Sequence, residues 1–219
     1  MKNIFIVFDF DGTLVDTQKH HAKIESDLLA TFDINLTPEF ITQTYAGRTP
    51  REWISEVLSQ YNIAVNIHIL EQFEAQKNEK IIALAKDWTI WLLPGVQDII
   101  MKLKKANIPL WISSWTSIYA LQILIDFYEL WINYYTSADE VENKKPAPDV
   151  FNKTFEKMWA LIESKRIVIG DWISDVIWWK AAWAQTIYVG TSAENAKNNW
   201  ATLCIPSFTD LTLDTIYSL

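Results

Sequence analysis

The chain has 219 residues, a length that suits one domain with an insertion or two small domains. Half of the residues are hydrophobic and 21% are charged, a balance that is typical of a soluble globular protein and excludes a largely disordered chain. The formal net charge of -8 excludes nucleic acid as a favoured partner, because most of the surface would repel a polyanion.

The first predicted element is a buried strand at residues 4–8, an apolar run that ends in DFDGT. This run is too short for a signal peptide or a membrane span. We therefore expect a cytoplasmic protein with no membrane partner.

Residues 16–92 contain no comparable strand pattern. Apolar residues recur there at spacings of three and four, which predicts a bundle of about four amphipathic helices. Thr37 before Pro38 and Thr49 before Pro50 suit the N-cap and first positions of two of these helices. The segment therefore reads as a helical insertion directly after the first strand.

Helix and strand patterns alternate from Pro94 onward. Strands are predicted at 108–113, 134–137, 166–169, 186–189 and 202–205, and helices at 96–106, 117–127, 148–158, 175–182, from 193 and near 211. Such alternation predicts a parallel sheet with helices on both faces. The predicted fold class is α/β: a Rossmann-like, doubly wound core of residues 1–15 and 93–219, with the helical bundle of residues 16–92 inserted.

Polar side chains follow three of the predicted strands, at the edge where the carboxyl ends of parallel strands meet. They are Asp9, Asp11, Ser113, Ser114, Asp171, Ser174 and Asp175, and Lys144 and Lys145 precede a predicted helix. Carboxylates gathered at one edge repel each other unless a cation is present, and hard oxygen ligands select Mg²⁺. The lysines and serines could complete a pocket for a phosphate that shares this ion.

Each part of this pattern also has a simpler interpretation when it is taken alone. Asp9 and Asp11 could form an ordinary acidic turn, and Lys144 and Lys145 could be a solvated pair. Together they favour chemistry: a carboxylate beside phosphorus can form an aspartyl phosphate, and a second one can protonate the leaving oxygen and later deprotonate a water.

Four segments together resemble a known family. DFDGTLVDT, the serine pair after PLWI, KKPAPDVF and GDWISD are similar, in order and spacing, to the four signature motifs of the haloacid dehalogenase (HAD) superfamily. The inserted helices resemble the cap domain of its phosphoglycolate phosphatase and beta-phosphoglucomutase group. The resemblance implies an HAD-like core with a helical cap, and a Mg²⁺-dependent phosphatase that acts on a small phosphorylated metabolite.

The resemblance also implies residue roles. Asp9 would be the nucleophile and Asp11 the acid and base, with Asp9, the Asp11 carbonyl, Asp171 and Asp175 as the metal site. A dehalogenase lacks the second aspartate because it has no alkoxide to protonate. Asp11 therefore favours phosphoryl transfer over carbon–halogen cleavage.

The remaining predicted site residues bind the substrate. Ser114 or, one residue away, Ser113 would hold the phosphoryl oxygens with Lys145; Gly12 and Thr13 would offer backbone N–H groups; and Thr17, Gly47 and Arg48 would face the substrate from the cap. Lys144 departs from the family pattern, which usually has glycine there. A phosphomutase on the same fold and an inactive binding protein stay open as alternatives, and we expect a monomer or a weak homo-oligomer.

Tryptophan is unusually common and glycine unusually rare, with 12 and 5 residues. Several tryptophans follow predicted helices, where a left-handed residue and usually glycine is expected, among them Trp159, Trp183 and Trp200. Tryptophan and glycine together make up about 8% of the chain, close to the ordinary glycine share. We therefore hypothesise that many of these positions are UGA codons that the source cell reads as glycine.

The alternative is that the tryptophans are genuine and form an aromatic lining, as in sites that stack sugars or bases. Their scatter over turns and helix ends argues against a single lining. Genuine tryptophans at Trp115 and Trp172 would crowd the predicted phosphate site and put activity in doubt.

Overall fold

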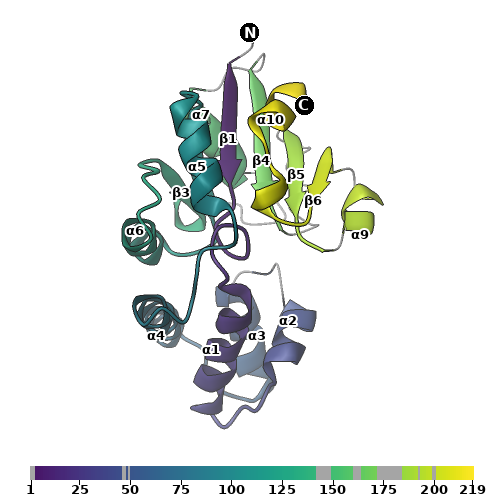
Figure 1. Cartoon of the computed structure of the whole chain (residues 1–219). Coiled ribbons are helices and arrows are strands. Elements are labelled where there is room, and N and C mark those ends of the chain that lie inside the picture. Colours follow the sequence, from purple (N-terminus) through teal and green to yellow (C-terminus); the bar gives the residue numbers. More distant parts are fainter. Residues whose placement is uncertain are drawn as a thin grey trace. The chain divides into compact units, whose positions relative to one another are not determined.

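The computed structural model describes residues 3–45, 48, 50–141, 149–159, 164–171, 184–191, 193–198 and 201–219. The chain forms two compact units (Figure 1). The larger unit comprises Met1–Asp16 and Trp91–Leu219, and the helical unit comprises Thr17–Ile90. The chain thus passes between the units at two places, directly after Asp16 and directly before Trp91.

The larger unit contains a six-stranded sheet in the described part of the chain. Its strands are β1 (Ile4–Phe8), β2 (Leu110–Ser114), β3 (Tyr135–Ser137), β4 (Lys165–Gly170), β5 (Gln185–Val189) and β6 (Leu203–Ile205). They pair in parallel in the order β3-β2-β1-β4-β5-β6. The strand order reverses beside β1, which makes the carboxyl end of β1 the place where this class of sheet binds ligands. The predicted α/β fold class is confirmed.

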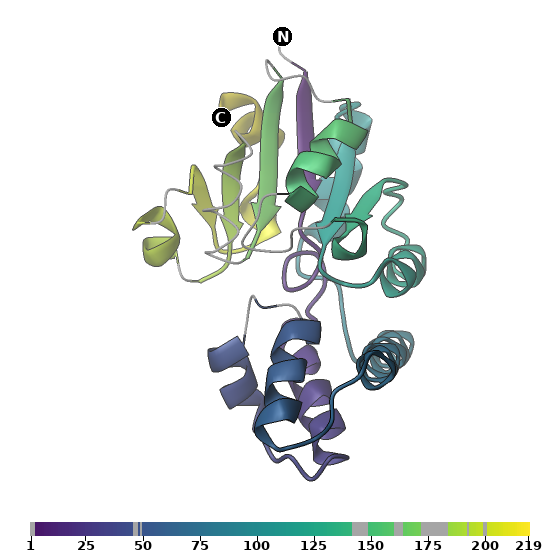
Figure 2. The ribbon, with the colours of Figure 1, turned by 180° about the vertical axis from the view of Figure 1, so that it is seen from behind.

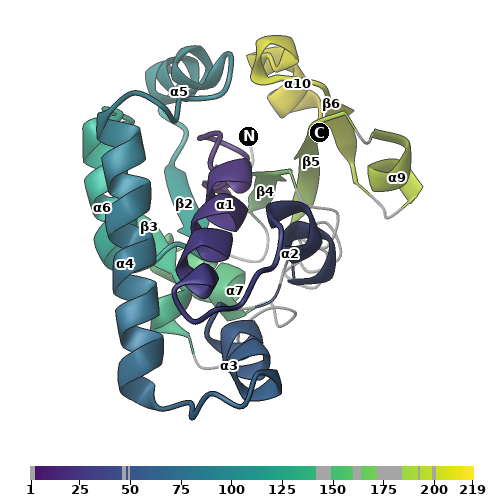
Figure 3. The same cartoon turned by 90° about the horizontal axis from the view of Figure 1, so that it is seen from below.

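Helices cover both faces of the sheet (Figures 2 and 3). The helices and 3₁₀ turns of this unit are α5 (Val96–Lys105), α6 (Ile118–Phe127), η1 (Ala138–Glu140), α7 (Asp149–Lys157), α9 (Ala193–Asn198), η2 (Phe208–Asp210) and α10 (Leu213–Ser218). Side chains alternate between the faces along a strand. Val7 therefore packs with Phe151 and Phe155 of α7, whereas the ring of Phe8 lies 6.1 Å from that of Phe208 on the opposite face.

Glycine is required at the start of α5. Gly95 has φ +86°, and a Cβ atom there would lie 2.6 Å from the backbone nitrogen of Thr209. Only glycine has both the conformational freedom and the missing side chain for this approach. Gly95 thus lets the first turn of α5 lie against η2. The helix predicted at residues 175–182 lies outside the described residues.

The helical unit contains the predicted bundle. Its helices are α1 (Gln18–Ala30), α2 (Pro38–Tyr45), α3 (Pro50–Gln60) and α4 (Ile67–Lys86). Proline occupies the first position of α2 and of α3, and Thr37 Oγ1 accepts a hydrogen bond from Phe40 N at 3.2 Å. A largely buried ion pair links α1 to α4, with 2.5 Å between Lys77 Nζ and Glu25 Oε1. None of the described helices of either unit is long and apolar enough to cross a membrane.

Candidate active site

The register of three adjacent strands brings distant site residues to one edge of the sheet. Phe8 of β1 is level with Ile112 of β2 on one side and with Ile169 of β4 on the other. Asp9 follows β1 directly, and its backbone N–H donates to Ile169 O at 2.9 Å. Asp171 directly follows the end of β4. The three strand ends therefore place the predicted acidic residues at the carboxyl edge, as parallel pairing requires.

The loop after β1 is fixed by its own backbone. Leu14 N and Val15 N both donate to Phe10 O, at 2.9 and 3.1 Å, and Gly12 N donates to Val15 O at 2.8 Å. Gly12 has φ +75°, a left-handed conformation that glycine adopts without steric cost. Asp9 stands at the start of this loop with 4% of its surface exposed. Backbone hydrogen bonds therefore hold the loop that begins at the predicted nucleophile.

Asp11 is held by two hydroxyl groups, one from the last residue of β2 and one from the loop that follows it. Its Oδ2 atom accepts hydrogen bonds from Ser114 Oγ at 3.1 Å and from Thr116 Oγ1 at 2.6 Å. Ser114 Oγ in turn accepts from Thr116 N at 2.9 Å. The structure thus joins the predicted acid and base to the predicted phosphate ligand. Sequence reasoning missed Thr116, although a second hydroxyl residue so soon after a strand end could have pointed to it.

Ser113 and Ser114 differ in their surroundings. Because side chains alternate along β2, the two hydroxyl groups point to opposite faces of the strand. Ser114 contacts Asp11, whereas the buried Ser113 Oγ has no hydrogen-bond partner among the described residues. The geometry favours Ser114 as the residue of the site, with Ser113 as the less suitable alternative.

Thr13 links the β1 loop to the end of β4. Its buried Oγ1 atom donates to Asp171 Oδ1 at 2.8 Å, which orients that carboxylate. The described residues contain no group of three histidine, cysteine or acidic side chains arranged to hold a metal ion. Asp175, the remaining predicted metal ligand, lies outside the described residues. The metal site therefore stays a prediction.

The other predicted substrate ligands are less well defined. Lys144, Lys145 and Gly47 lie outside the described residues. In the helical unit, the Arg48 guanidinium forms an ion pair with Glu56 at 2.6 Å and lies over the ring of Tyr45, 5.7 Å from its centroid. Thr17 occupies the N-cap position of α1, and its carbonyl accepts from His20 N at 2.9 Å. The contacts of these five predicted ligands with a substrate stay predictions.

This fold belongs to a known class. Residues 6–189 match the model of the haloacid dehalogenase-like hydrolase family. The match covers well over half of the chain, so the chain belongs to this family. The resemblance that the four sequence motifs indicate is confirmed, and so is the prediction of a hydrolase.

One curated relative and two solved structures show which proteins the chain is similar to. The chain is 27% identical over 165 residues to protein CbbY of Rhodobacter capsulatus, which covers 69% of this chain and 70% of that protein. A crystal structure of a CbbY mutant from Rhodobacter sphaeroides in complex with xylulose-(1,5)bisphosphate is similar with a TM-score of 0.83 at 22% identity, and covers 96% of both chains. Beta-phosphoglucomutase from Clostridium difficile is similar with a TM-score of 0.79 at 22% identity, over 98% of this chain and 95% of that one. At these identities, the two structures show a shared fold.

Proposed function

We propose that the protein is a Mg²⁺-dependent phosphatase that hydrolyses a small phosphorylated metabolite, of the phosphoglycolate or sugar phosphate type, through an aspartyl phosphate on Asp9. One observation carries the proposal: Asp11, two residues after the buried Asp9, is hydrogen-bonded to the strand-end hydroxyls of Ser114 and Thr116. This arrangement supplies a nucleophile, a proton donor and a phosphate ligand at one edge of the sheet.

The reaction would proceed in two displacements at phosphorus. In the first, a carboxylate oxygen of Asp9 attacks, the bond from phosphorus to the ester oxygen breaks, and Asp11 gives a proton to the leaving alkoxide. In the second, Asp11 takes a proton from a water that attacks the same phosphorus. The Asp9–phosphorus bond then breaks, which releases inorganic phosphate and restores both carboxyl groups to their initial states.

The donors at this edge suit magnesium. Carboxylate oxygens of Asp9 and Asp171, with the main-chain carbonyl of Asp11, are hard ligands at neighbouring strand ends, and Asp175 would complete the set. Bound Mg²⁺ would neutralise negative charge on the phosphate oxygens. Thr13 contributes through its hydrogen bond to Asp171 Oδ1, which fixes the direction of that carboxylate before the ion binds.

Other residues would position the phosphate and select the substrate. The Ser114 hydroxyl, already held beside Asp11, would turn to a phosphoryl oxygen, with Lys145 as the cationic partner. We propose that the helical unit is a cap that excludes water from the first step and reopens for the second, with hinges near residues 15–17 and 86–93. Thr17, Gly47 and Arg48 would then discriminate between substrates. The sugar bisphosphate bound to the related CbbY mutant supports a sugar phosphate as the substrate.

A phosphomutase is the second candidate, and the similarity to beta-phosphoglucomutase supports it. The test incubates the purified protein with Mg²⁺ and a panel of sugar phosphates, and measures both free phosphate and isomer. We expect stoichiometric phosphate release, which falls by at least about 1,000-fold in Asp9→Asn because an amide is a poor nucleophile.

The matched control for this test is Asp33→Asn, an exposed aspartate of the helical unit, which should leave turnover unchanged. Isomer formation without phosphate release would favour the mutase. Absence of turnover with every substrate would favour an inactive binding protein.

A further inference from the structure

Backbone conformation and burial distinguish two groups among the described tryptophans, one of two residues and one of three. The structure describes Trp53, Trp88, Trp91, Trp111, Trp115, Trp131 and Trp159. Trp53 is 2% exposed and stacks on Tyr45 with 4.7 Å between ring centroids. Trp111 is 7% exposed, stacks on Tyr134 at 4.8 Å, and donates from Nε1 to a threonine hydroxyl. These two rings fill space in the interior and make specific contacts.

Three others combine an unfavourable backbone with an exposed ring. Trp88, Trp131 and Trp159 have φ values of +55°, +56° and +55°, in the left-handed region where a Cβ atom is strained. Their exposed fractions are 51%, 67% and 87%, so each large ring buries little surface to offset that strain. Such positions are normally occupied by glycine or, less often, by asparagine or aspartate.

The hydrogen bonds at the end of α4 show that Trp88 occupies the left-handed position that follows this helix. Trp88 N donates to Ala85 O and Thr89 N donates to Leu84 O, both at 2.9 Å, which is the Schellman pattern of a helix C-terminus. Glycine is the preferred residue at its left-handed position. Trp159 has the equivalent first bond after α7, from its own N to Glu156 O at 2.9 Å.

Three other helices among the described residues end in the expected way. The left-handed residue is Asp33 after α1, Asn62 after α3 and Asn107 after α5, each with the same pair of hydrogen bonds. After α6 it is Glu129, which has a slender, unbranched side chain. The chain also places glycine at positive φ elsewhere, as Gly12 does at +75°. Tryptophan is therefore the residue type in this set whose size nothing in the fold explains.

We propose that positions 88, 131 and 159 are glycine positions, so that the protein made in its own cell carries glycine there through UGA codons. Trp53 and Trp111 are genuine tryptophans. The composition indicates an excess of tryptophan in the whole chain, whereas backbone conformation and burial identify the individual positions. It also predicts that tryptophan in the left-handed region destabilises the chain that contains it.

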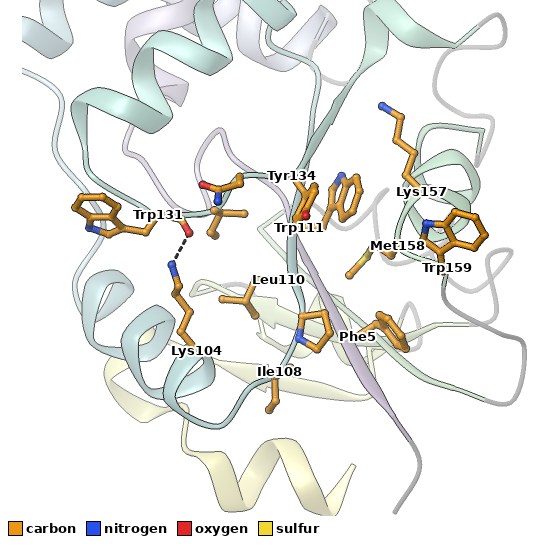
Figure 4. Close-up of a pocket in the computed structure, with 13 residues that line it drawn as sticks. Phe5, Lys104, Ile108, Leu110, Trp111, Trp131, Tyr134, Lys157, Met158 and Trp159 are labelled. Atoms are coloured by element: carbon orange, nitrogen blue, oxygen red, sulfur yellow. Dashed lines mark hydrogen bonds between the residues drawn. The ribbon is translucent and has the colours of Figure 1, made fainter.

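The proposal changes the interpretation of a groove in the larger unit. The groove, of about 470 Å³, lies at the amino ends of β1 and β2 (Figure 4). Trp131 and Trp159 form two of its walls, with Trp111 and Tyr134 between them. Glycine at the two wall positions would open this groove to solvent, so we assign no ligand to it. The hydrogen bond from Lys104 Nζ ends on the backbone carbonyl of Trp131, and glycine would retain it.

Peptide mass spectrometry of the protein purified from its native cells tests the proposal directly. We expect glycine at positions 88, 131 and 159, and tryptophan at positions 53 and 111. The corresponding codons should be UGA at the first three and UGG at the other two. Tryptophan in the native peptides at the three left-handed positions would overturn the proposal.

Urea unfolding of recombinant variants tests its physical basis. Trp88→Gly and Trp159→Gly should raise the folding equilibrium constant by about threefold to tenfold, because relief of left-handed strain exceeds the entropic cost of glycine. The matched control Trp111→Gly should lower it by about 100-fold or more, because it removes a buried ring. A comparable loss in Trp88→Gly and Trp159→Gly would contradict the proposal.

Discussion

The carboxyl and amino edges of the same sheet differ in the contacts that their side chains make. At the carboxyl edge, Asp11, Ser114 and Thr116 come from two neighbouring strand ends and hydrogen-bond to one another. At the amino edge, the side chains around Trp111 and Met158 pack by apolar contact. We therefore expect substitutions at the carboxyl edge to change turnover with little change in the free energy of unfolding. Substitutions at the amino edge should lower the free energy of unfolding with little change in turnover.

The largest effect expected after loss of the nucleophile comes from Asp11→Asn. Turnover should fall by about 100-fold to 10,000-fold, because the leaving oxygen loses its proton donor. The loss should be greater for an alkyl phosphate than for p-nitrophenyl phosphate, since nitrophenolate leaves readily without a proton. Steady-state rates with both substrates measure the difference. Equal losses would argue against an acid role for Asp11.

The counterpart at the amino edge is Phe155→Ala. Phe155 is buried in the cluster of Trp111 and Met158, beneath the Arg166 guanidinium at 5.0 Å from its ring centroid. Its truncation should lower the free energy of unfolding by about 3–5 kcal/mol, because it leaves a cavity. Urea unfolding measures this, and turnover per folded molecule should stay unchanged. A loss of turnover at full folding would show that the two edges are coupled.

Thr116→Val tests the finer structure of the carboxyl edge. The change keeps the shape of the side chain and removes the 2.6 Å hydrogen bond to Asp11. We expect kcat to fall by about tenfold with little change in KM, because a hydrogen bond to a charged group that orients the acid is lost.

Two further variants test whether the effect on kcat comes from the loss of the Thr116 hydroxyl. Thr116→Ser restores the hydroxyl and should restore most of kcat, whereas Thr42→Val, at an exposed threonine of α2, should change neither constant. A rise in KM with unchanged kcat would instead place Thr116 in substrate binding.

The sequence was sufficient for the strands of the described sheet and for the edge of that sheet to which Asp9, Asp11 and Asp171 are brought. The apolar run before DFDGT predicted β1 with the bounds that the structure shows. Parallel pairing then implied that Asp9 and Asp171 would share an edge. These predictions work because burial and strand connection act on whole segments.

Individual contacts could not be predicted in the same way. The bonds from Thr116 to Asp11 and from Thr13 to Asp171 depend on the path of each loop, which hydrophobic periodicity does not specify. Composition indicated an excess of tryptophan, but the left-handed backbone of Trp131 becomes visible only in the folded chain. Local periodicity therefore predicts segments, and tertiary geometry determines the contacts between them.

The smallest expected effect concerns the ion pair between Glu140 of η1, which follows β3, and Lys157 of α7. Glu140 Oε2 accepts from Lys157 Nζ at 2.5 Å, and Glu140 Oε1 accepts from Ser137 N at 3.1 Å. Burial alone would raise the pKa of Glu140, but the hydrogen bonds from Lys157 and Ser137 and the charges of Lys157 and Lys153 outweigh it and hold this pKa below 4.5. A carboxyl whose pKa is lowered by folding stabilises the protein above its unfolded pKa, and that stabilisation disappears as pH falls through the folded value.

Glu140→Gln should therefore lower the free energy of unfolding at pH 7 by less than about 1 kcal/mol, since the pair is partly exposed. The difference from the unsubstituted chain should shrink as the pH falls through the lowered, folded pKa of Glu140, below which its carboxyl is protonated in both states. Urea unfolding at pH 7 and at acid pH measures it, and Glu156→Gln, on the exposed side of α7, serves as the matched control. A difference that persists unchanged at acid pH would mean that Glu140 acts through packing, because packing does not depend on its charge.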